Sequence, residues 1–175
     1  HSKSVIGDPT LVTGKEVTGV RRFGKLLVID LTGRLHLAIH FKMSGQLILV
    51  RSSQSALRRK GDEIEQRIVG GHPTEDWIKP LPSSHTRAVF YFKSGDRMYF
   101  NDQRIFGRIK IMSSSQLAQD RFVSRLGPEP WDLSDQEFYT LISKKKKAIK
   151  VLIMEQEILS GVGNIYANDG LWEAR

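Results

Sequence analysis

The stretch Gly161-Val162-Gly163-Asn164-Ile165-Tyr166-Ala167 follows closely behind Lys144-Lys145-Lys146-Lys147-Ala148-Ile149-Lys150. Two glycines one residue apart predict a tight turn with exposed backbone N–H groups, and Asn164 is suited to cap the helix that follows. A helix N-terminus attracts an anion, and the four consecutive lysines and Lys150 are expected to lie within reach of the same anion. We therefore expect a phosphate-binding turn between two helices, although a lone glycine turn of this kind is also an ordinary helix C-cap.

The helical pattern extends on both sides of this turn and begins after Ser113. Ser134-Asp135-Gln136-Glu137 has the form of a capping box and predicts the start of a helix. Asn164 is expected to start a last helix that runs through Trp172. The helix before the turn is expected to end at Ser160-Gly161, with an apolar face made of Ile149, Leu152, Ile153, Ile158 and Leu159.

The first part of the chain has a different pattern, with apolar runs of strand length separated by turn residues. Such runs occupy 17–31, 34–41 and 46–50, a hairpin is expected over 88–100, and 108–112 forms a further strand. Several short antiparallel strands imply a sandwich. The sequence thus predicts the α+β class, with an antiparallel β-sandwich domain over residues 1–112 followed by an all-helical domain over 113–175.

A long polar segment, Ser52 to Ser84, interrupts the strand pattern. It contains Leu57-Arg58-Arg59-Lys60 and Gly70-Gly71-His72-Pro73. Loops of this length are usually functional or disordered. We expect a solvated surface loop, with contact between its basic patch and DNA as the alternative.

The composition limits the classes of function. The chain has 175 residues, 27 Lys+Arg against 19 Asp+Glu and a net charge of +8, which suits a polyanionic partner. Without cysteine it has no disulfides and no cysteine-ligated metal, and no apolar run is long enough for a bilayer span or a signal peptide. We expect a soluble intracellular protein that binds no metal through this chain.

Six segments carry a resemblance to a known family. They are Arg21-Arg22-Phe23-Gly24-Lys25-Leu26-Leu27, His40-Phe41-Lys42-Met43-Ser44-Gly45, His85-Thr86-Arg87, Asn101-Asp102-Gln103-Arg104-Ile105-Phe106-Gly107, Leu126-Gly127-Pro128-Glu129-Pro130, and Lys147-Ala148-Ile149-Lys150 through Ala167. In this order they resemble the bacterial formamidopyrimidine-DNA glycosylases, and they cover nearly all of the chain except Ser52 to Ser84. The resemblance implies a β-sandwich followed by a helix-two-turn-helix domain.

The resemblance also implies how the protein fills a gap in damaged DNA. A base inside a duplex is reached only by extruding its nucleotide, and the void must then be filled. Met43 would take the space of the extruded nucleotide, Arg104 would face the orphaned partner base, and Phe106 would wedge between bases. Arg104 and Phe106 are two residues apart and point the same way on an extended segment. The alternative is that Met43 and Phe106 are core residues.

Other matching positions are expected to hold the DNA backbone. By resemblance, Lys25 contacts a phosphate near the lesion and donates a proton during strand cleavage, which makes it the candidate catalytic residue; its alternative is a surface lysine on a strand edge. His85, Lys145, Lys150 and Asn164 match positions that contact phosphates, which positions a duplex without reading its sequence. A basic run is otherwise often a solvated helix end.

Three departures from the family pattern affect the expected activity. The chain begins His1-Ser2-Lys3 rather than with the family's nucleophilic N-terminal proline and glutamate, and internal proline nitrogens are acylated and cannot attack. The family's C-terminal zinc finger, which would bring Zn to the full-length protein, is missing. Ile105 stands where the family has a second basic residue. We therefore expect a fragment that binds DNA without cleaving it.

The parent protein is then expected to excise oxidised purines, such as 8-oxoguanine and formamidopyrimidine, and to cleave the abasic strand by β/δ-elimination. Its partner would be double-stranded DNA with oxidised bases or abasic sites, and the parent would be a cytoplasmic monomer at the bacterial nucleoid. Two alternatives stay open: a non-catalytic protein that binds damaged DNA, and the branch of the family that prefers oxidised pyrimidines.

Overall fold

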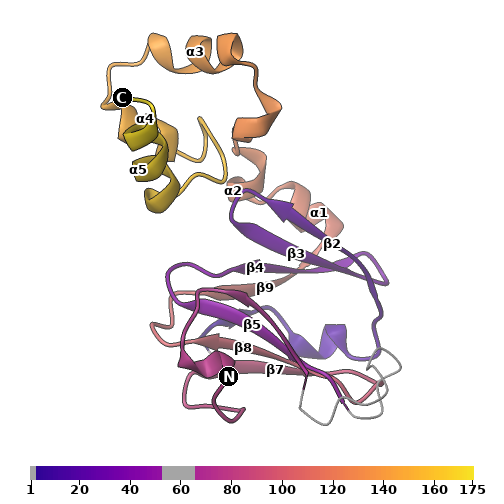
Figure 1. Cartoon of the computed structure of the whole chain (residues 1–175). Helices are drawn as coiled ribbons and strands as arrows, with labels where there is room; N and C mark the ends of the chain where they lie inside the picture. The colour runs from indigo at the N-terminus through magenta and orange to yellow at the C-terminus, as the bar shows by residue number, and fades with distance from the viewer. Residues whose placement is uncertain (1–2, 53–65) are drawn as a thin grey trace. The chain divides into compact units, whose positions relative to one another are not determined.

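The computed structural model describes residues 3–52 and 66–175, and the chain divides into two compact units. Unit 1 consists of His1–Gly14 and Leu37–Ile111, and unit 2 of Lys15–His36 and Met112–Arg175. Figure 1 shows the strands and helices that belong to them. The boundaries predicted from the sequence, 1–112 and 113–175, stay a prediction. The basic patch at 57–60 lies outside the described residues.

A four-stranded antiparallel sheet forms most of unit 1, in the order β6-β5-β8-β7. Its strands are β5 (Gly45–Val50), β6 (Arg67–Gly71), β7 (Thr86–Tyr91) and β8 (Arg97–Asp102). Ile48 pairs with Tyr99 and both are buried, together with Val50, in a cluster that Trp77 and Leu81 help to cover. The hairpin expected over 88–100 is confirmed, because β7 and β8 pair around the turn at 94–96.

The expectation of a loop over 52–84 is wrong for part of that segment. Residues 67–71 form β6, whose backbone pairs with all of β5 except Gly45. A single 3₁₀ turn, η2 (Glu75–Trp77), follows with Thr74 as its N-cap. The pairing joins residues far apart in the sequence, so the local composition of the segment did not reveal it.

A second sheet has five strands in the order β1-β9-β4-β3-β2. Its strands are β1 (Val5–Ile6), β2 (Val17–Phe23), β3 (Leu26–Leu31), β4 (Leu35–His40) and β9 (Arg108–Ser113), and a 3₁₀ turn, η1 (Pro9–Val12), lies between β1 and β2. β2 and β3 form an antiparallel hairpin inside the run 17–31. The sequence did not indicate its turn at Gly24-Lys25, where Gly24 has φ +53°.

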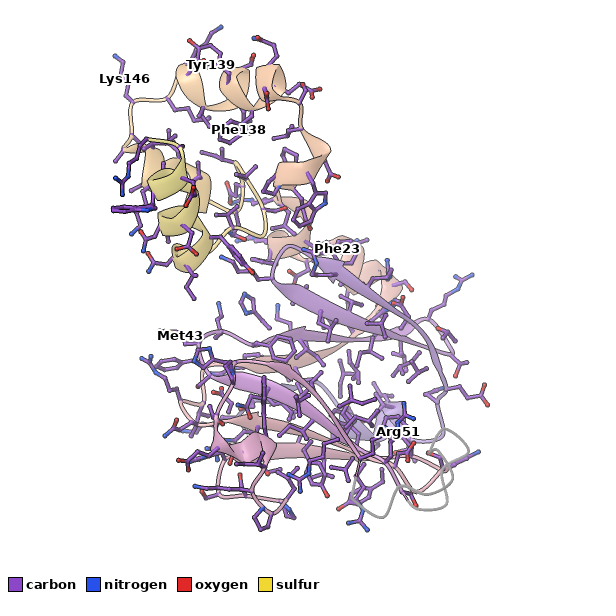
Figure 2. All side chains as sticks on the ribbon, in the orientation of Figure 1. Phe23, Met43, Arg51, Phe138, Tyr139 and Lys146 are labelled. Carbon is purple, nitrogen blue, oxygen red and sulfur yellow. The ribbon has the colours of Figure 1, made fainter. Side chains whose placement is uncertain are left out.

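Six short helical elements belong to unit 2. They are α1 (Ser114–Ala118), α2 (Arg121–Ser124), η3 (Pro130–Asp132), α3 (Asp135–Ser143), α4 (Ile149–Met154) and α5 (Asn164–Glu173). The predicted capping box at Ser134 and Glu137 is confirmed at the start of α3. Figure 2 shows Phe138 pointing from α3 into the helical part, where it packs against Ile153, Leu159 and Ala167, and Tyr139 pointing outward. With two mainly antiparallel sheets and these helices, the α+β class is confirmed.

The helix expected to reach Leu159 ends earlier. α4 stops at Met154, and Glu155 already has an extended backbone with ψ 110°. Ile158 and Leu159 are buried as expected, but they reach the core from a turn in which Ile158 N–H donates to Glu155 O over 2.8 Å. The apolar spacing itself breaks here, because Gln156 and Glu157 occupy the positions where a continuing helix would present apolar residues.

Candidate nucleic-acid interface

The Asp102 carboxylate organises the loop that carries the candidate void-filling residues in unit 1. Asp102 is fully buried at the end of β8. One oxygen accepts from Ser44 Oγ and from Arg104 N–H at 3.2 Å, and the other accepts from Gly107 N–H at 2.6 Å. Because a buried carboxylate is costly unless such donors satisfy it, the loop 103–107 and the turn before β5 are held in one arrangement.

Met43, Arg104 and Phe106 come together on this frame. The Arg104 guanidinium lies 5.0 Å from the centre of the Phe106 ring, and Arg104 Nη1 lies 3.2 Å from Met43 Sδ. The segment is not extended as expected, because Ile105 has φ +59°. Arg104 and Phe106 are therefore brought together by a tight bend and a cation–π contact rather than by strand geometry.

The exposure of the two apolar side chains argues against the alternative that they are core residues. Met43 is 60% exposed and Phe106 is 50% exposed, so neither belongs to a core. Figure 2 shows Met43 projecting from the loop between β4 and β5. Met43, Phe106 and the Arg104 cation are thus exposed on a loop that the buried Asp102 carboxylate fixes. Such a surface is suited to contact with a partner.

His85 is attached to the same frame through its backbone. Its carbonyl oxygen accepts from Asp102 N–H at 2.9 Å. Its ring is half-buried, and Nδ1 lies 2.9 Å from the carboxylate of Asp76 in η2. Asp102 therefore contacts both His85 and the loop 103–107. The carboxylate of Asp76, which lies in the segment 52–84, is a further neighbour of His85, and the sequence did not indicate it as functional.

In unit 2, Lys25 meets the glycine turn. Its ammonium donates to Val162 O over 2.6 Å. A Cβ at Gly163 would lie 3.3 Å from Lys25 Nζ, so the absence of a side chain at Gly163 makes room for the amine. Burial lowers the pKa of Lys25 below its ordinary value of 10.5. Lys25 is therefore a partly desolvated amine on the predicted phosphate-binding turn, rather than a lysine on an isolated strand edge.

The turn itself differs in two details from the expected one. Gly161 has φ +85° and its N–H donates to Gln156 Oε1 at 3.1 Å, so this N–H is not an exposed donor. Gln156 Nε2 also donates to Val162 O at 2.9 Å. The N-cap of α5 is Gly163, and Asn164 is the first helical residue, so the expectation that Asn164 caps the helix is wrong. The Asn164 side chain is exposed at the helix start.

A second contact fixes the β2–β3 hairpin within unit 2. The Arg22 guanidinium makes a bidentate pair with the Glu129 carboxylate, with both distances at 2.7 Å, and Glu129 also accepts from Gly24 N–H. Arg22 lies 5.2 Å from the Trp131 ring. Since Gly24 precedes Lys25, Glu129 holds the backbone that carries the amine. Both partners lie in segments that carry the family resemblance, but the sequence did not pair them.

The lysine run is only partly available to a ligand. Lys147 pairs with Glu155 at 2.6 Å. Lys145 is exposed just beyond α3, and Lys150 is half-buried in the first turn of α4. Figure 2 shows Lys146 pointing away from the helices. The expectation that all these lysines reach one anion is therefore too broad, because Lys147 already has a carboxylate partner.

Comparison with known proteins identifies the family. The model of the formamidopyrimidine-DNA glycosylase N-terminal domain matches residues 6–109, and the model of the formamidopyrimidine-DNA glycosylase H2TH domain matches residues 126–175. The chain belongs to the formamidopyrimidine-DNA glycosylase family. The β-sheet frame around Asp102 and the glycine turn at 161–163 therefore lie in the N-terminal domain and the H2TH domain of this family.

Individual formamidopyrimidine-DNA glycosylases are similar to this chain in sequence and in structure. The one from Chloroflexus aurantiacus is 31% identical over 167 residues, covering 94% of this chain and 50% of its own length, and the one from Solibacter usitatus is 32% identical over 172 residues. The crystal structure of the MutM (Fpg) protein from Thermus thermophilus has a TM-score of 0.68 at 28% identity, covering 98% of this chain and 53% of its own. A complex between Lactococcus lactis Fpg and abasic-site DNA has a TM-score of 0.68 at 25% identity, covering 93% and 51%. The chain thus spans about half the length of the relatives it matches.

A metal-ligand cluster and a membrane-spanning helix are both absent from the described residues. Among residues 3–52 and 66–175, no three His, Asp or Glu side chains gather as metal ligands would, and no helix there is long and apolar enough to cross a bilayer. The chain has no cysteine, so its own residues cannot supply the thiolate ligands of a zinc finger.

Proposed function

We propose that this protein binds double-stranded DNA at damaged sites as part of base-excision repair. The observation that carries the proposal is the exposed group of Met43, Arg104 and Phe106, held by the buried Asp102 carboxylate. Extruding a nucleotide leaves a gap in the base stack, and apolar and cationic side chains that are already in place fill it at low entropic cost. The glycine turn with Lys25 and the net charge of +8 supply attraction to the phosphate backbone.

The complete family member is proposed to excise oxidised purines and to cleave the abasic strand by β/δ-elimination, with Lys25 as a proton donor. Family membership and the name of the relatives support this reaction class. The lowered pKa of Lys25 suits proton transfer, because an amine with a reduced pKa exchanges its proton more readily near neutral pH. A monomer at the bacterial chromosome, in the cytoplasm, and a zinc finger in the complete protein remain part of the proposal.

The proposed phosphate contacts involve four residues that the family resemblance indicated. His85 in unit 1, and Lys145, Lys150 and Asn164 in unit 2, are proposed to contact phosphates, which fixes the duplex without selecting a sequence. Asn164 is the first residue of α5, so its side chain and the helix start would face the same phosphate.

The test compares affinity for a short duplex that carries a stable abasic-site analogue with affinity for the same duplex undamaged, across a salt series. We expect tighter binding to the damaged duplex by about ten-fold, or about 1.4 kcal/mol. Arg104→Ala should remove this preference, whereas Arg121→Ala, which removes the same charge from an exposed position of α2, should keep it. Equal, salt-sensitive binding to both duplexes by the wild-type chain would contradict lesion recognition and leave only electrostatic attraction.

A further inference from the structure

The Asp76 carboxylate is buried against the ring of His85. Asp76 is 5% exposed, and its Oδ2 lies 2.9 Å from His85 Nδ1. A carboxylate at such a position needs donors, and the ring N–H is one. Nδ1 faces Asp76. Among the described residues no contact of Nε2 is seen, so Nε2 is the ring nitrogen that a ligand could reach.

Asp76 is itself held from the centre of the sheet. Gln46, which is 1% exposed on β5, donates its side-chain N–H groups to the backbone oxygen of His72 and, at 2.7 Å, to Thr74 Oγ1. Thr74 Oγ1 in turn accepts from Asp76 N–H at 3.2 Å. This series of contacts fixes the start of η2, and with it the direction of the Asp76 carboxylate.

The backbone of His85 is fixed from the other side. Its N–H donates to Ser83 Oγ at 3.1 Å, and its carbonyl accepts from Asp102 N–H. Asn101 supports the same corner, because it accepts from Thr86 Oγ1 at 2.8 Å. With the backbone held by β8 and the ring held by Asp76, the imidazole has one orientation.

We propose that Asp76 is a positioning residue that orients the His85 imidazole so that Nε2 meets a DNA phosphate. This rests on the proposed DNA binding and adds a residue from the segment 66–85. A phosphate oxygen accepts hydrogen bonds, so Nε2 must carry a proton in the complex while Nδ1–H stays on Asp76. The contact with the Asp76 carboxylate then keeps the ring from turning away from the phosphate.

The test is a double-mutant cycle on affinity for the undamaged duplex. Asp76→Asn and His85→Gln are each expected to weaken binding about three- to ten-fold, the range for one hydrogen bond. In the His85→Gln background, Asp76→Asn should cause no further loss. Glu75→Gln is the matched control, because it removes a neighbouring carboxylate that is exposed and pairs with Lys79 instead, and it should leave the affinity unchanged.

A spectroscopic measurement separates positioning from a structural role. The ring ¹⁵N signals of His85 should show a proton on Nδ1 in the wild-type chain and in Glu75→Gln, and should lose that pattern in Asp76→Asn at an unchanged melting temperature. Additive losses in the cycle, or an unchanged ring pattern in Asp76→Asn, would overturn the proposal while leaving DNA binding intact. Absence of duplex binding by the wild-type chain would instead overturn the proposed function and this inference together.

Discussion

The Gly107 backbone N–H donates to the Asp102 carboxylate over 2.6 Å, across a five-residue bend that carries Arg104 and Phe106. Gly107 has no room for a side chain, because a Cβ there would lie 2.8 Å from Phe100 Cζ and 3.0 Å from Asp102 Oδ2. The bend is therefore closed by a buried charge at one end and a glycine at the other. The positions of the exposed Arg104 and Phe106 side chains therefore depend on the buried Asp102 and Gly107.

Asp102→Asn should separate lesion recognition from general DNA binding. The amide that replaces one oxygen would face backbone N–H groups or Ser44, so one buried donor loses its acceptor, at a cost of about 1–3 kcal/mol of unfolding free energy. The loop should then hold Arg104 less firmly, and the preference for a duplex with an abasic analogue should fall. Urea unfolding and the paired binding assay measure the two effects.

Asp96→Asn is a useful comparison for this variant. Asp96 is also buried and accepts from Ser52 N–H at 2.7 Å, but it lies in the β7–β8 turn, away from the bend at 103–107. It should lower stability while the preference for the damaged duplex persists. Equal loss of preference in both variants would show that stability alone, and not the Asp102 frame, controls recognition.

Lys25 should make the stability of the chain rise with pH in alkaline solution. Burial lowers its pKa in the folded state below the ordinary 10.5, so between these two values the unfolded chain binds more protons. The penalty for burying the ammonium is fully present below the folded pKa and disappears as the pH approaches 10.5. Urea midpoints of the wild type should therefore gain on those of Lys25→Met across this window. Lys146→Met, at an exposed lysine, is the control: the difference in urea midpoint between the wild type and this variant should stay constant across the window.

Gly163→Ala tests the room that the turn leaves for this amine. The new Cβ would meet Lys25 Nζ at 3.3 Å and Cε at 3.4 Å, so the flexible end of the lysine must move and its contact with Val162 O should lengthen. We expect the pKa of Lys25 to return toward its ordinary value, with a stability loss of about 1 kcal/mol from a poorer N-cap. NMR titration of isotopically methylated lysines follows this directly. An unchanged Lys25 titration in a folded variant would refute the steric link.

Gly127→Ala and Gly170→Ala should change stability in opposite directions. A Cβ at Gly127 would lie 2.5 Å from the backbone oxygen of Ile158, which cannot move aside easily, and would disturb the bond from Gly127 N–H to Gln156 O. We expect a loss of about 1–3 kcal/mol. Gly170 lies in α5 with open space around it, so alanine should add roughly 0.5–1 kcal/mol. Thermal unfolding of the two variants beside the wild type decides the matter, and a shared sign would be a clear contradiction.

Local signals in the sequence were reliable where the structure is local. The capping box at Ser134 and the β7–β8 hairpin depend on neighbours within a few residues, and both are confirmed. The early end of α4 was visible in principle, since Gln156 and Glu157 interrupt the apolar spacing, and side-chain contacts of Gln156 with the following turn accompany it. Gln156 uses its side chain to bind Gly161 and Val162, which a helical Gln156 on a continued α4 would not do.

The members of the candidate site come from the family resemblance and stay a prediction, whereas the contacts that support them come from the structure. Family resemblance indicated Met43, Arg104 and Phe106, and their exposure agrees with a role at a surface. The strand geometry offered for Arg104 and Phe106 was wrong, because the left-handed backbone of Ile105 depends on the contacts of Asp102. The pairing of Asp76 with His85 left no signal in the sequence, since the two lie nine positions apart and are brought together by the fold rather than by a regular element.

Strand β6 carries a practical warning for anyone who engineers a smaller version of this protein. Its segment has the composition of a dispensable loop, and a designer working from sequence alone would choose it for deletion. Removal of 66–84 would uncover the edge of β5, whose Ile48 and Val50 are buried, and a bare edge of this kind recruits other chains. The trimmed protein would be expected to precipitate during expression, and a redesign should retain 66–84 and shorten the chain elsewhere.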